Sequence, residues 1–322
     1  RVVQLDPTDF DAQWSLGDFY LAAGKTDEAS KLAESLLGAR PQHPAGYLLR
    51  AGLALGADRV SDAIGLLKQA TELDQTMVRP LLALANIYFA QQELRQAAEW
   101  YERALKVAPS SADVRVARGH FLFATGTPEE GRKEFQKAVE LSPDQEHVRL
   151  VLADRYVALG RRDGAERELS GLVADMNSHK ARKALAELKL AAGQVAETKP
   201  LVSAILEADE HDPVGIYLKG RIALAENDVP QAVGLFEESI GRNATLSGPH
   251  LYLGLARLAQ GRVDSAQEAL REAIRLQPDN EAAHLTLAKL YLAQQKQAEA
   301  EKEARQALRL NPANLEAAVL YG

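Results

Sequence analysis

The chain has 322 residues, which is long for a single hydrophobic core and suits either two domains or one extended repeat array. Its formal net charge of −7 opposes binding to phosphate backbones, so we expect no nucleic-acid partner. The absence of cysteine excludes disulfides and thiolate metal sites, and no apolar run approaches the ~20 residues of a membrane-spanning helix.

Prolines and small residues recur along the chain with a period of 34 residues, as Pro41, Pro109 and Pro143 illustrate. Small residues keep this spacing in two series. The first series is Gly17, Ala51, Ala85, Gly119, Ala153, Gly220, Gly254 and Ala288, and the second is Ala29, Ala63, Ala97, Gly131, Ala165, Ala232, Ala266 and Ala300. We therefore predict nine repeats over residues 10–314, beginning near residues 10, 44, 78, 112, 146, 180, 213, 247 and 281.

Two partial repeats are expected at the ends of the printed sequence. Residues 1–9 are predicted to end a preceding repeat, and residues 315–322 to begin a further, truncated one. Neither end carries the polar cap that a helical array needs in water. We therefore expect further repeats in a longer parent chain or end-to-end association between copies.

Each repeat is predicted to contain two amphipathic helices. In the third repeat, residues 79–90 and 95–107 place apolar side chains at i, i+3, i+4 and i+7. Glycine favours the turn between the two helices, because it adopts positive φ at little cost. Such turns are predicted at Gly24, Gly126, Gly160, Gly193 and Gly261.

The sixth repeat, residues 180–212, departs from the pattern. Glu187 and Lys199 fall on its two small-residue positions, and Pro200 falls where the second helix should be under way. Because proline disrupts a helix interior, we predict that this second helix starts late and that the array is irregular there. A functional hinge and simple sequence divergence both account for this pattern.

Several motifs resemble the tetratricopeptide repeat family. Leu16-Gly17 followed by Tyr20 is similar to the first half of its consensus, and Ala97, Tyr101 and Pro109 are similar to the second half. The resemblance covers essentially the whole chain. It implies an all-α, right-handed superhelical solenoid of antiparallel helix pairs in which the first helices line a concave groove.

The resemblance also implies that partners bind the groove side of the first helices. The candidate partner-binding residues are Trp14, Asp18, Arg79, Leu82, Asn86, Phe89, Asp113, His120, His147, Asp154, Tyr217, Arg221 and Lys289. One groove position is apolar in nearly every repeat, as at Trp14 and Leu82. Such residues can anchor a helical or extended peptide, but they can equally serve only to pack neighbouring helices.

No constellation of residues predicts catalysis, a cofactor or a metal. The seven histidines are scattered and form no short metal-binding pair, so we interpret them as helix-surface or packing residues. The alternative is a zinc site in which His120 and His147 converge with Asp113 or Asp154. We expect a non-catalytic protein, since acid–base chemistry needs convergent groups in an enclosed pocket.

The chain lacks two sets of ligand-binding residues that specialised members of the family use. The carboxylate clamp that binds chaperone tails is disfavoured, because only Asn86 resembles a clamp residue. The asparagine ladder of protein glycosyltransferases is absent, because its positions hold Ser15, Leu49, Ala83, Ala117 and Val151.

The sequence therefore predicts a protein-interaction scaffold that binds a peptide or protein. Its long, Ala-rich repeat array is similar to those of bacterial proteins that organise exopolysaccharide assembly and export. This resemblance implies a location in the bacterial cytoplasm or in the periplasm and cell envelope. One alternative is the regulatory or substrate-recruiting array of a larger enzyme. Another is a solenoid that binds a carbohydrate polymer.

Overall fold

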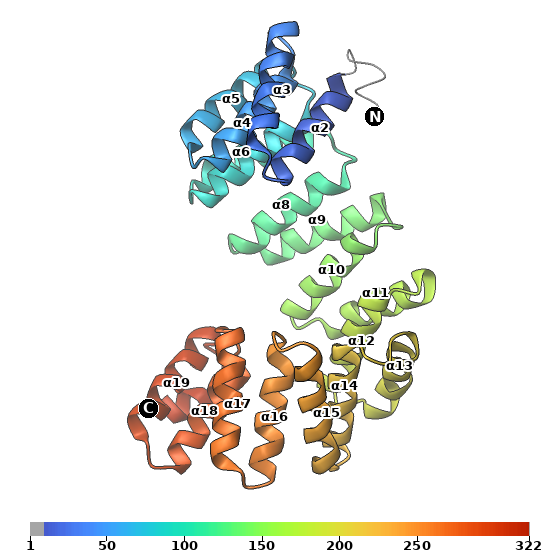
Figure 1. The fold of residues 1–322 in the computed structure, drawn as a ribbon, viewed down its shortest axis with the longest axis vertical. Helices are drawn as coiled ribbons and strands as arrows, with labels where there is room; N and C mark the ends of the chain where they lie inside the picture. Colours follow the sequence, from blue (N-terminus) through green and yellow to red (C-terminus); the bar gives the residue numbers. More distant parts are fainter. Residues whose placement is uncertain (1–9, 322) are drawn as a thin grey trace. The chain divides into compact units, whose positions relative to one another are not determined.

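The chain divides into two compact units, residues 1–161 and residues 162–322. The computed structural model describes residues 10–321, and these form nineteen helices and no strands (Figure 1). The helices of the first unit are α2 (Phe10–Ala22), α3 (Thr26–Ala39), α4 (Pro44–Gly56), α5 (Val60–Leu73), α6 (Val78–Ala90), α7 (Leu94–Val107), α8 (Ala112–Ala124), α9 (Pro128–Leu141) and α10 (Glu146–Ala158).

The second unit continues the same alternation of helices. Its helices are α11 (Arg162–Met176), α12 (His179–Ala191), α13 (Val195–Ala208), α14 (Pro213–Ala225), α15 (Val229–Arg242), α16 (Ser247–Ala259), α17 (Val263–Leu276), α18 (Glu281–Ala293), α19 (Gln297–Leu310) and α20 (Leu315–Tyr321). Residues 1–9, expected to end a preceding repeat, lie outside the described residues. No helix within residues 10–321 is both long and apolar enough to cross a membrane.

Within each unit the helices pack as antiparallel pairs, which confirms the predicted all-α architecture (Figure 1). A first helix of 13 residues is followed by a second helix that begins sixteen residues after the first one began. Thus α4 packs on α5, α6 on α7, α14 on α15 and α16 on α17. Since no pair can bury its apolar faces alone, the stacking of neighbouring pairs forms the core within each unit.

The sixth pair is regular, so the prediction of a late second helix is wrong. Its first helix, α12, begins at His179, and α13 begins at Val195 with the usual offset of sixteen residues. The predicted starts at residues 180 and 213 placed a 33-residue step between the sixth and seventh repeats, but this step falls between the fifth and sixth first helices, which begin at Glu146 and His179. It coincides with Asn177, whose φ is 49°.

In the observed register, different residues occupy the two small-residue positions of this pair. Ala186 and Thr198 are both fully buried and take the positions assigned above to Glu187 and Lys199. Pro200 lies inside α13 on its exposed side, while Val202 and Ile205 on the other side are buried. The apolar packing of these residues keeps α13 continuous despite the hydrogen bond that proline cannot donate.

The turn between the two helices of a pair is the same in every repeat. The five predicted glycines have φ between 67° and 87°, in the left-handed region. The other four repeats place Asp58, Gln92, Asn227 and Gln295 there, with φ between 57° and 65°. The turn geometry therefore persists where a side chain makes it more costly.

Two helix backbones approach each other closely in the fourth pair. A Cβ added to Gly131 in α9 would lie 2.7 Å from the carbonyl oxygen of Gly119 in α8 and 3.0 Å from the amide nitrogen of Phe123. Both neighbours are backbone atoms, which cannot move aside cheaply. This explains why glycine stands here where most repeats have alanine.

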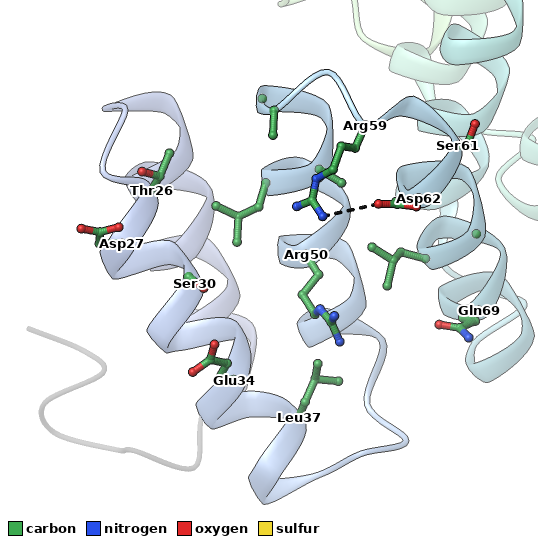
Figure 2. Close-up of a pocket in the computed structure, with 16 residues that line it drawn as sticks. Thr26, Asp27, Ser30, Glu34, Leu37, Arg50, Arg59, Ser61, Asp62 and Gln69 are labelled. Atoms are coloured by element: carbon green, nitrogen blue, oxygen red, sulfur yellow. Dashed lines mark hydrogen bonds and ion pairs between the residues drawn. The ribbon is translucent and has the colours of Figure 1, made fainter.

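Neighbouring first helices are closer together than neighbouring second helices. The first helices α2 and α4 contact each other, as do α12 and α14, and α14 and α16. Between the second helices α3 and α5 there is instead an open cavity of about 1140 Å³, into which Arg50 of α4 projects (Figure 2). A smaller cavity of about 480 Å³ lies between α13 and α15, with Lys219 of α14 in its lining. Within each unit the first helices thus form the inner face.

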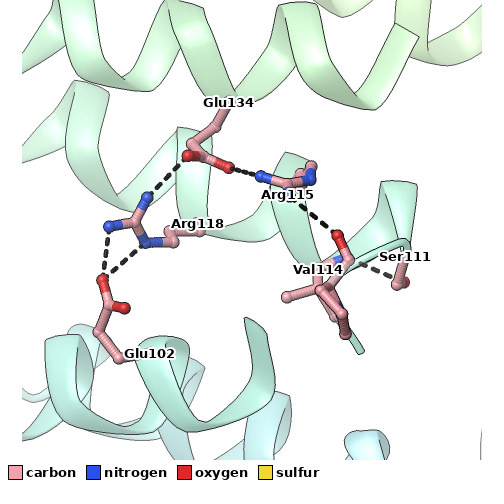
Figure 3. Close-up of polar contacts among 7 residues, drawn as sticks. Glu102, Ser111, Val114, Arg115, Arg118 and Glu134 are labelled. Carbon is pink, nitrogen blue, oxygen red and sulfur yellow. Dashed lines mark hydrogen bonds and ion pairs between the residues drawn. The ribbon is translucent and has the colours of Figure 1, made fainter. Parts of the chain in front are cut away.

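A charged network fills the equivalent space between α7 and α9 (Figure 3). Arg118 of α8 occupies the same helix position as Arg50, and it pairs with Glu102 of α7 at 2.5 Å and with Glu134 of α9 at 2.9 Å. Arg115 pairs with the other oxygen of Glu134 at 2.8 Å. The Glu134 side chain is only 8% exposed, so two guanidinium groups compensate one nearly buried carboxylate.

A buried histidine joins the two helices of the ninth pair. His284 of α18 places Nδ1 2.6 Å from Oε2 of Glu303 and Nε2 3.0 Å from the carbonyl oxygen of Pro278. Both partners accept hydrogen bonds, so the ring must carry two protons to satisfy both. Burial, the largest single influence, favours the neutral ring, but the hydrogen bonds to Glu303 and Pro278 together raise the pKa of His284.

We expect the second unit to lose stability as the pH rises through the folded-state pKa of His284. That pKa is raised above the unfolded value of about 6.5, so the protonated ring contributes fully below that pH and its contribution is lost at higher pH. Urea unfolding measured at about pH 6 and about pH 9 would reveal this loss, and His284→Gln should diminish it.

The matched control for this experiment is His250→Gln. His250 occupies the equivalent position in α16, where Ala269 replaces the glutamate that pairs with His284. We expect this variant to retain the pH dependence of the wild type. An equal loss of pH dependence in both variants would contradict the assignment to His284.

Candidate partner-binding groove

The candidate residues lie on the inner face of each unit, at the second, fifth, ninth and twelfth positions of the first helices. The ninth residues of these helices are called the ninth-residue row below. Its charged or polar members are exposed or partly buried: Asp18, Asn86, His120, Asp154, Glu187, Arg221 and Lys289. The fifth residues are more enclosed. Leu82 packs against the core, and Tyr217 is buried within it.

Trp14 and Arg79 come together at the start of the first unit. The Arg79 guanidinium lies 3.6 Å from the centre of the Trp14 ring, although Trp14 is in α2 and Arg79 is in α6. Beside them is a cavity of about 280 Å³ whose apolar lining includes Leu48 and Met77. Two predicted residues separated by 65 positions in the sequence thus form one wall of one pocket.

Asn86 and Phe89 are held by neighbouring aromatic side chains. The Tyr101 hydroxyl donates a hydrogen bond of 2.5 Å to Oδ1 of Asn86, and burial raises the pKa of Tyr101 to about 12. Phe89 meets the ring of Phe121 edge-on at 5.5 Å. Asn86 is therefore a fixed groove residue whose amide group remains exposed.

The structure does not assemble the zinc alternative. His120 stacks edge-on against Phe135 at 5.0 Å, and desolvation by burial, aided by the charge of Arg155, lowers its pKa. Asp154 forms an ion pair with Arg155. Among the side chains described for residues 12–321, no three His, Asp or Glu are grouped closely enough to hold a metal ion. The two remaining candidates of this region, Asp113 and His147, are exposed on α8 and α10.

An aromatic and charged cluster lies on the inner face of the second unit. The Arg221 guanidinium is 4.4 Å from the Tyr252 ring and 5.7 Å from the Tyr217 ring, and its Nη1 lies 3.4 Å from the Tyr217 hydroxyl. Burial, the main influence, raises the pKa of Tyr217. The rings of Tyr217 and Tyr252 approach edge-on at 5.7 Å. Two tyrosines from successive first helices therefore hold one arginine in place.

Glu187 of α12 interacts electrostatically with Arg221 of this cluster and was missed by the sequence interpretation. The surrounding side chains desolvate its carboxylate and raise its pKa, while the charge of Arg221 acts in the opposite direction. In the correct register Glu187 belongs to the ninth-residue row, directly preceding Arg221. The 33-residue spacing between Gly160 and Gly193 is the sequence signal that could have placed it there.

The last predicted residue, Lys289, lies in α18. It forms an ion pair of 2.6 Å with Glu316 of α20, and both side chains are about half exposed. Lys289 therefore already has a partner within the chain. The cluster around Arg221 and the pocket beside Trp14 are the two places where candidate residues converge.

Comparison with known proteins agrees with this architecture. Tetratricopeptide repeat models match residues 1–53 and 122–188 in one case and residues 82–146 and 251–315 in another. A solved structure, the APC/C hetero-tetramer Cut9-Hcn1, aligns with a TM-score of 0.55 at 17% identity, covering 92% of this chain and 58% of that chain. At this level of identity the structural match supports the fold alone.

Curated relatives share shorter segments with this chain. Protein O-mannosyl-transferase TMTC1 of Homo sapiens is 33% identical over 95 residues, which is 30% of this chain and 11% of that protein. Cellulose synthase operon protein C of Xanthomonas axonopodis pv. citri (strain 306) is 27% identical over 161 residues, 48% of this chain and 11% of that protein. The chain thus spans only about a tenth of either relative. Together with the paired helices and their repeated small residues, the matched regions show that the chain belongs to the tetratricopeptide repeat family.

Proposed function

We propose that this chain is a non-catalytic scaffold that binds a peptide or protein along the inner face of its first helices. The observation that carries the proposal is the cluster in which Tyr217 and Tyr252 hold Arg221. Aromatic side chains and arginine dominate binding energy at protein interfaces. Here they are fixed in place before any partner arrives, which reduces the entropy lost on binding.

The proposed setting is a bacterial envelope or exopolysaccharide assembly system. The similarity to a protein named for the cellulose synthase operon supports this setting over 48% of the chain. A second candidate is a regulatory or substrate-recruiting array of a larger enzyme. It is favoured by the names of two other relatives, TMTC1 and a UDP-N-acetylglucosamine–peptide N-acetylglucosaminyltransferase of Giardia intestinalis, which is 35% identical over 84 residues.

The test is capture of peptides from an array of defined sequences by wild type and by two arginine variants. Arg221→Gln should lower capture by about tenfold or more, because it removes the cation of the groove cluster. Arg242→Gln, in the exposed last turn of α15, is the matched control and should leave capture unchanged. Thermal unfolding of all three proteins establishes that folding is equal.

Two results would count against the proposal. One is the absence of any peptide captured above background by the wild type. The other is equal capture by wild type and Arg221→Gln, which would remove the second unit's cluster from the binding surface.

A further inference from the structure

The pocket beside Trp14 gathers hydrogen-bond donors and positive charge around an apolar floor. It lies where α2 meets the N-terminal ends of α4 and α6, and it encloses about 280 Å³. Its apolar lining comes from Ala45, Leu48 and Met77, and its polar lining includes Arg79. That volume holds one or two side chains rather than a whole ligand of drug size.

Among the side chains described for residues 12–321, no carboxylate pairs with Arg79. Its guanidinium instead lies over the face of Trp14, 3.6 Å from the ring centre. The planar guanidinium carries several N–H donors whose fork matches a carboxylate in geometry. Arg79 is exposed, so a ligand can reach these donors.

A buried donor of Trp14 and the N-terminus of α6 add to this donor-rich surrounding. The indole Nε1 of Trp14 is buried without a hydrogen-bond partner, which is costly for a group that can only donate. The α6 N-terminus begins after Met77, whose side chain caps none of its free N–H groups. The positive end of the α6 dipole therefore adds to the charge of Arg79.

We propose that this pocket binds the side-chain carboxylate of a glutamate or aspartate within a peptide that lies along the first unit. The carboxylate accepts hydrogen bonds from Arg79, and an adjacent apolar side chain rests on Leu48 and Met77. A single cation with few donors suits a singly charged carboxylate better than a doubly charged phosphate. This inference rests on the proposed function, because it names the partner chemistry of one part of the same inner face.

The experiment uses three end-blocked eight-residue peptides of otherwise identical Leu- and Ala-containing sequence. They carry one central Glu, one central Gln or one central phosphoserine. Fluorescence polarisation of labelled peptides gives affinities, and Trp14 emission reports on the site. The chain has only two tryptophans, so Trp100→Phe makes Trp14 the sole indole. We expect the Glu peptide to bind about tenfold or more tightly than the Gln peptide and to change Trp14 emission.

Two arginine variants isolate the role of Arg79. Arg79→Gln should abolish the preference for Glu over Gln. The matched control is Arg103→Gln, because Arg103 also stacks on a tryptophan, Trp100, at 4.2 Å, but on the second helix α7. We expect this control to retain the preference. Urea unfolding of each variant excludes loss of the fold as the cause.

The outcomes separate this inference from the proposed function. Equal affinity for the Glu and Gln peptides, or an unchanged preference in Arg79→Gln, would overturn the carboxylate site. Tighter binding of the phosphoserine peptide would overturn it as well and assign the pocket to phosphopeptides. If the peptide array still yields binders that depend on Arg221 in either case, the scaffold proposal stands without this site.

Discussion

Glu134→Gln should lower the free energy of unfolding by about 3 kcal/mol, because it removes one partner of a nearly buried ion-pair network. The Glu134 side chain is 8% exposed, and those of Arg115 and Arg118 are 15% and 20% exposed. Without the carboxylate, two guanidinium groups remain in the space between α7 and α9 with little water to solvate them. Chemical denaturation followed by circular dichroism measures the loss.

Glu102→Gln is the matched control for this substitution. Glu102 also pairs with Arg118, but its side chain is 60% exposed, so water replaces the lost contact. We expect a loss below about 1 kcal/mol. Similar losses in the two variants would show that burial does not govern the strength of this network.

Phe236→Ala should cost about 4 kcal/mol and should also weaken partner capture. Phe236 is fully buried in α15, and its ring lies 6.2 Å from Tyr217 and 6.1 Å from Tyr252. Removing it leaves a cavity beneath the two tyrosines that hold Arg221. Denaturation measures the first effect, and the peptide array described above measures the second under conditions where the variant remains folded.

Leu292→Ala provides a comparison in the same unit. Leu292 is 45% exposed, so we expect less than about 1 kcal/mol of destabilisation and full capture. If Phe236→Ala captured peptides as well as the wild type while it was destabilised, the buried ring would support the fold without positioning the groove cluster.

The repeat could be predicted from the sequence because its signals are local and are repeated many times. Gly17, Ala51 and Ala85 recur at a fixed interval since the two helix backbones of their pairs approach closely. One register error entered at Asn177, where a 15-residue α11 replaces the usual 14-residue second helix. That error assigned Glu187 to a small-residue position, although it belongs to the ninth-residue row together with Arg221.

The convergence of side chains from different repeats was harder to predict. The stack of Arg79 on Trp14 joins α6 to α2, across the intervening pair, and depends on how tightly the first helices pack. Likewise, Tyr252 is the sixth residue of its helix and lay outside the chosen groove positions, yet its ring reaches Arg221 from the next repeat. The position of a residue within the repeat predicts which face of its helix it lies on. Whether it contacts a residue of another repeat depends on the length and direction of both side chains.

The network at Glu134 also has a mechanical consequence. Salt bridges tie α7, α8 and α9 together on the outer side (Figure 3), whereas the gap between α3 and α5 (Figure 2) and the gap between α13 and α15 remain open. A stack of repeats bends most easily where its outer side is not cross-linked. We therefore expect bending within each unit to concentrate at its open gap between second helices. The third and fourth repeats should instead move together as one rigid segment.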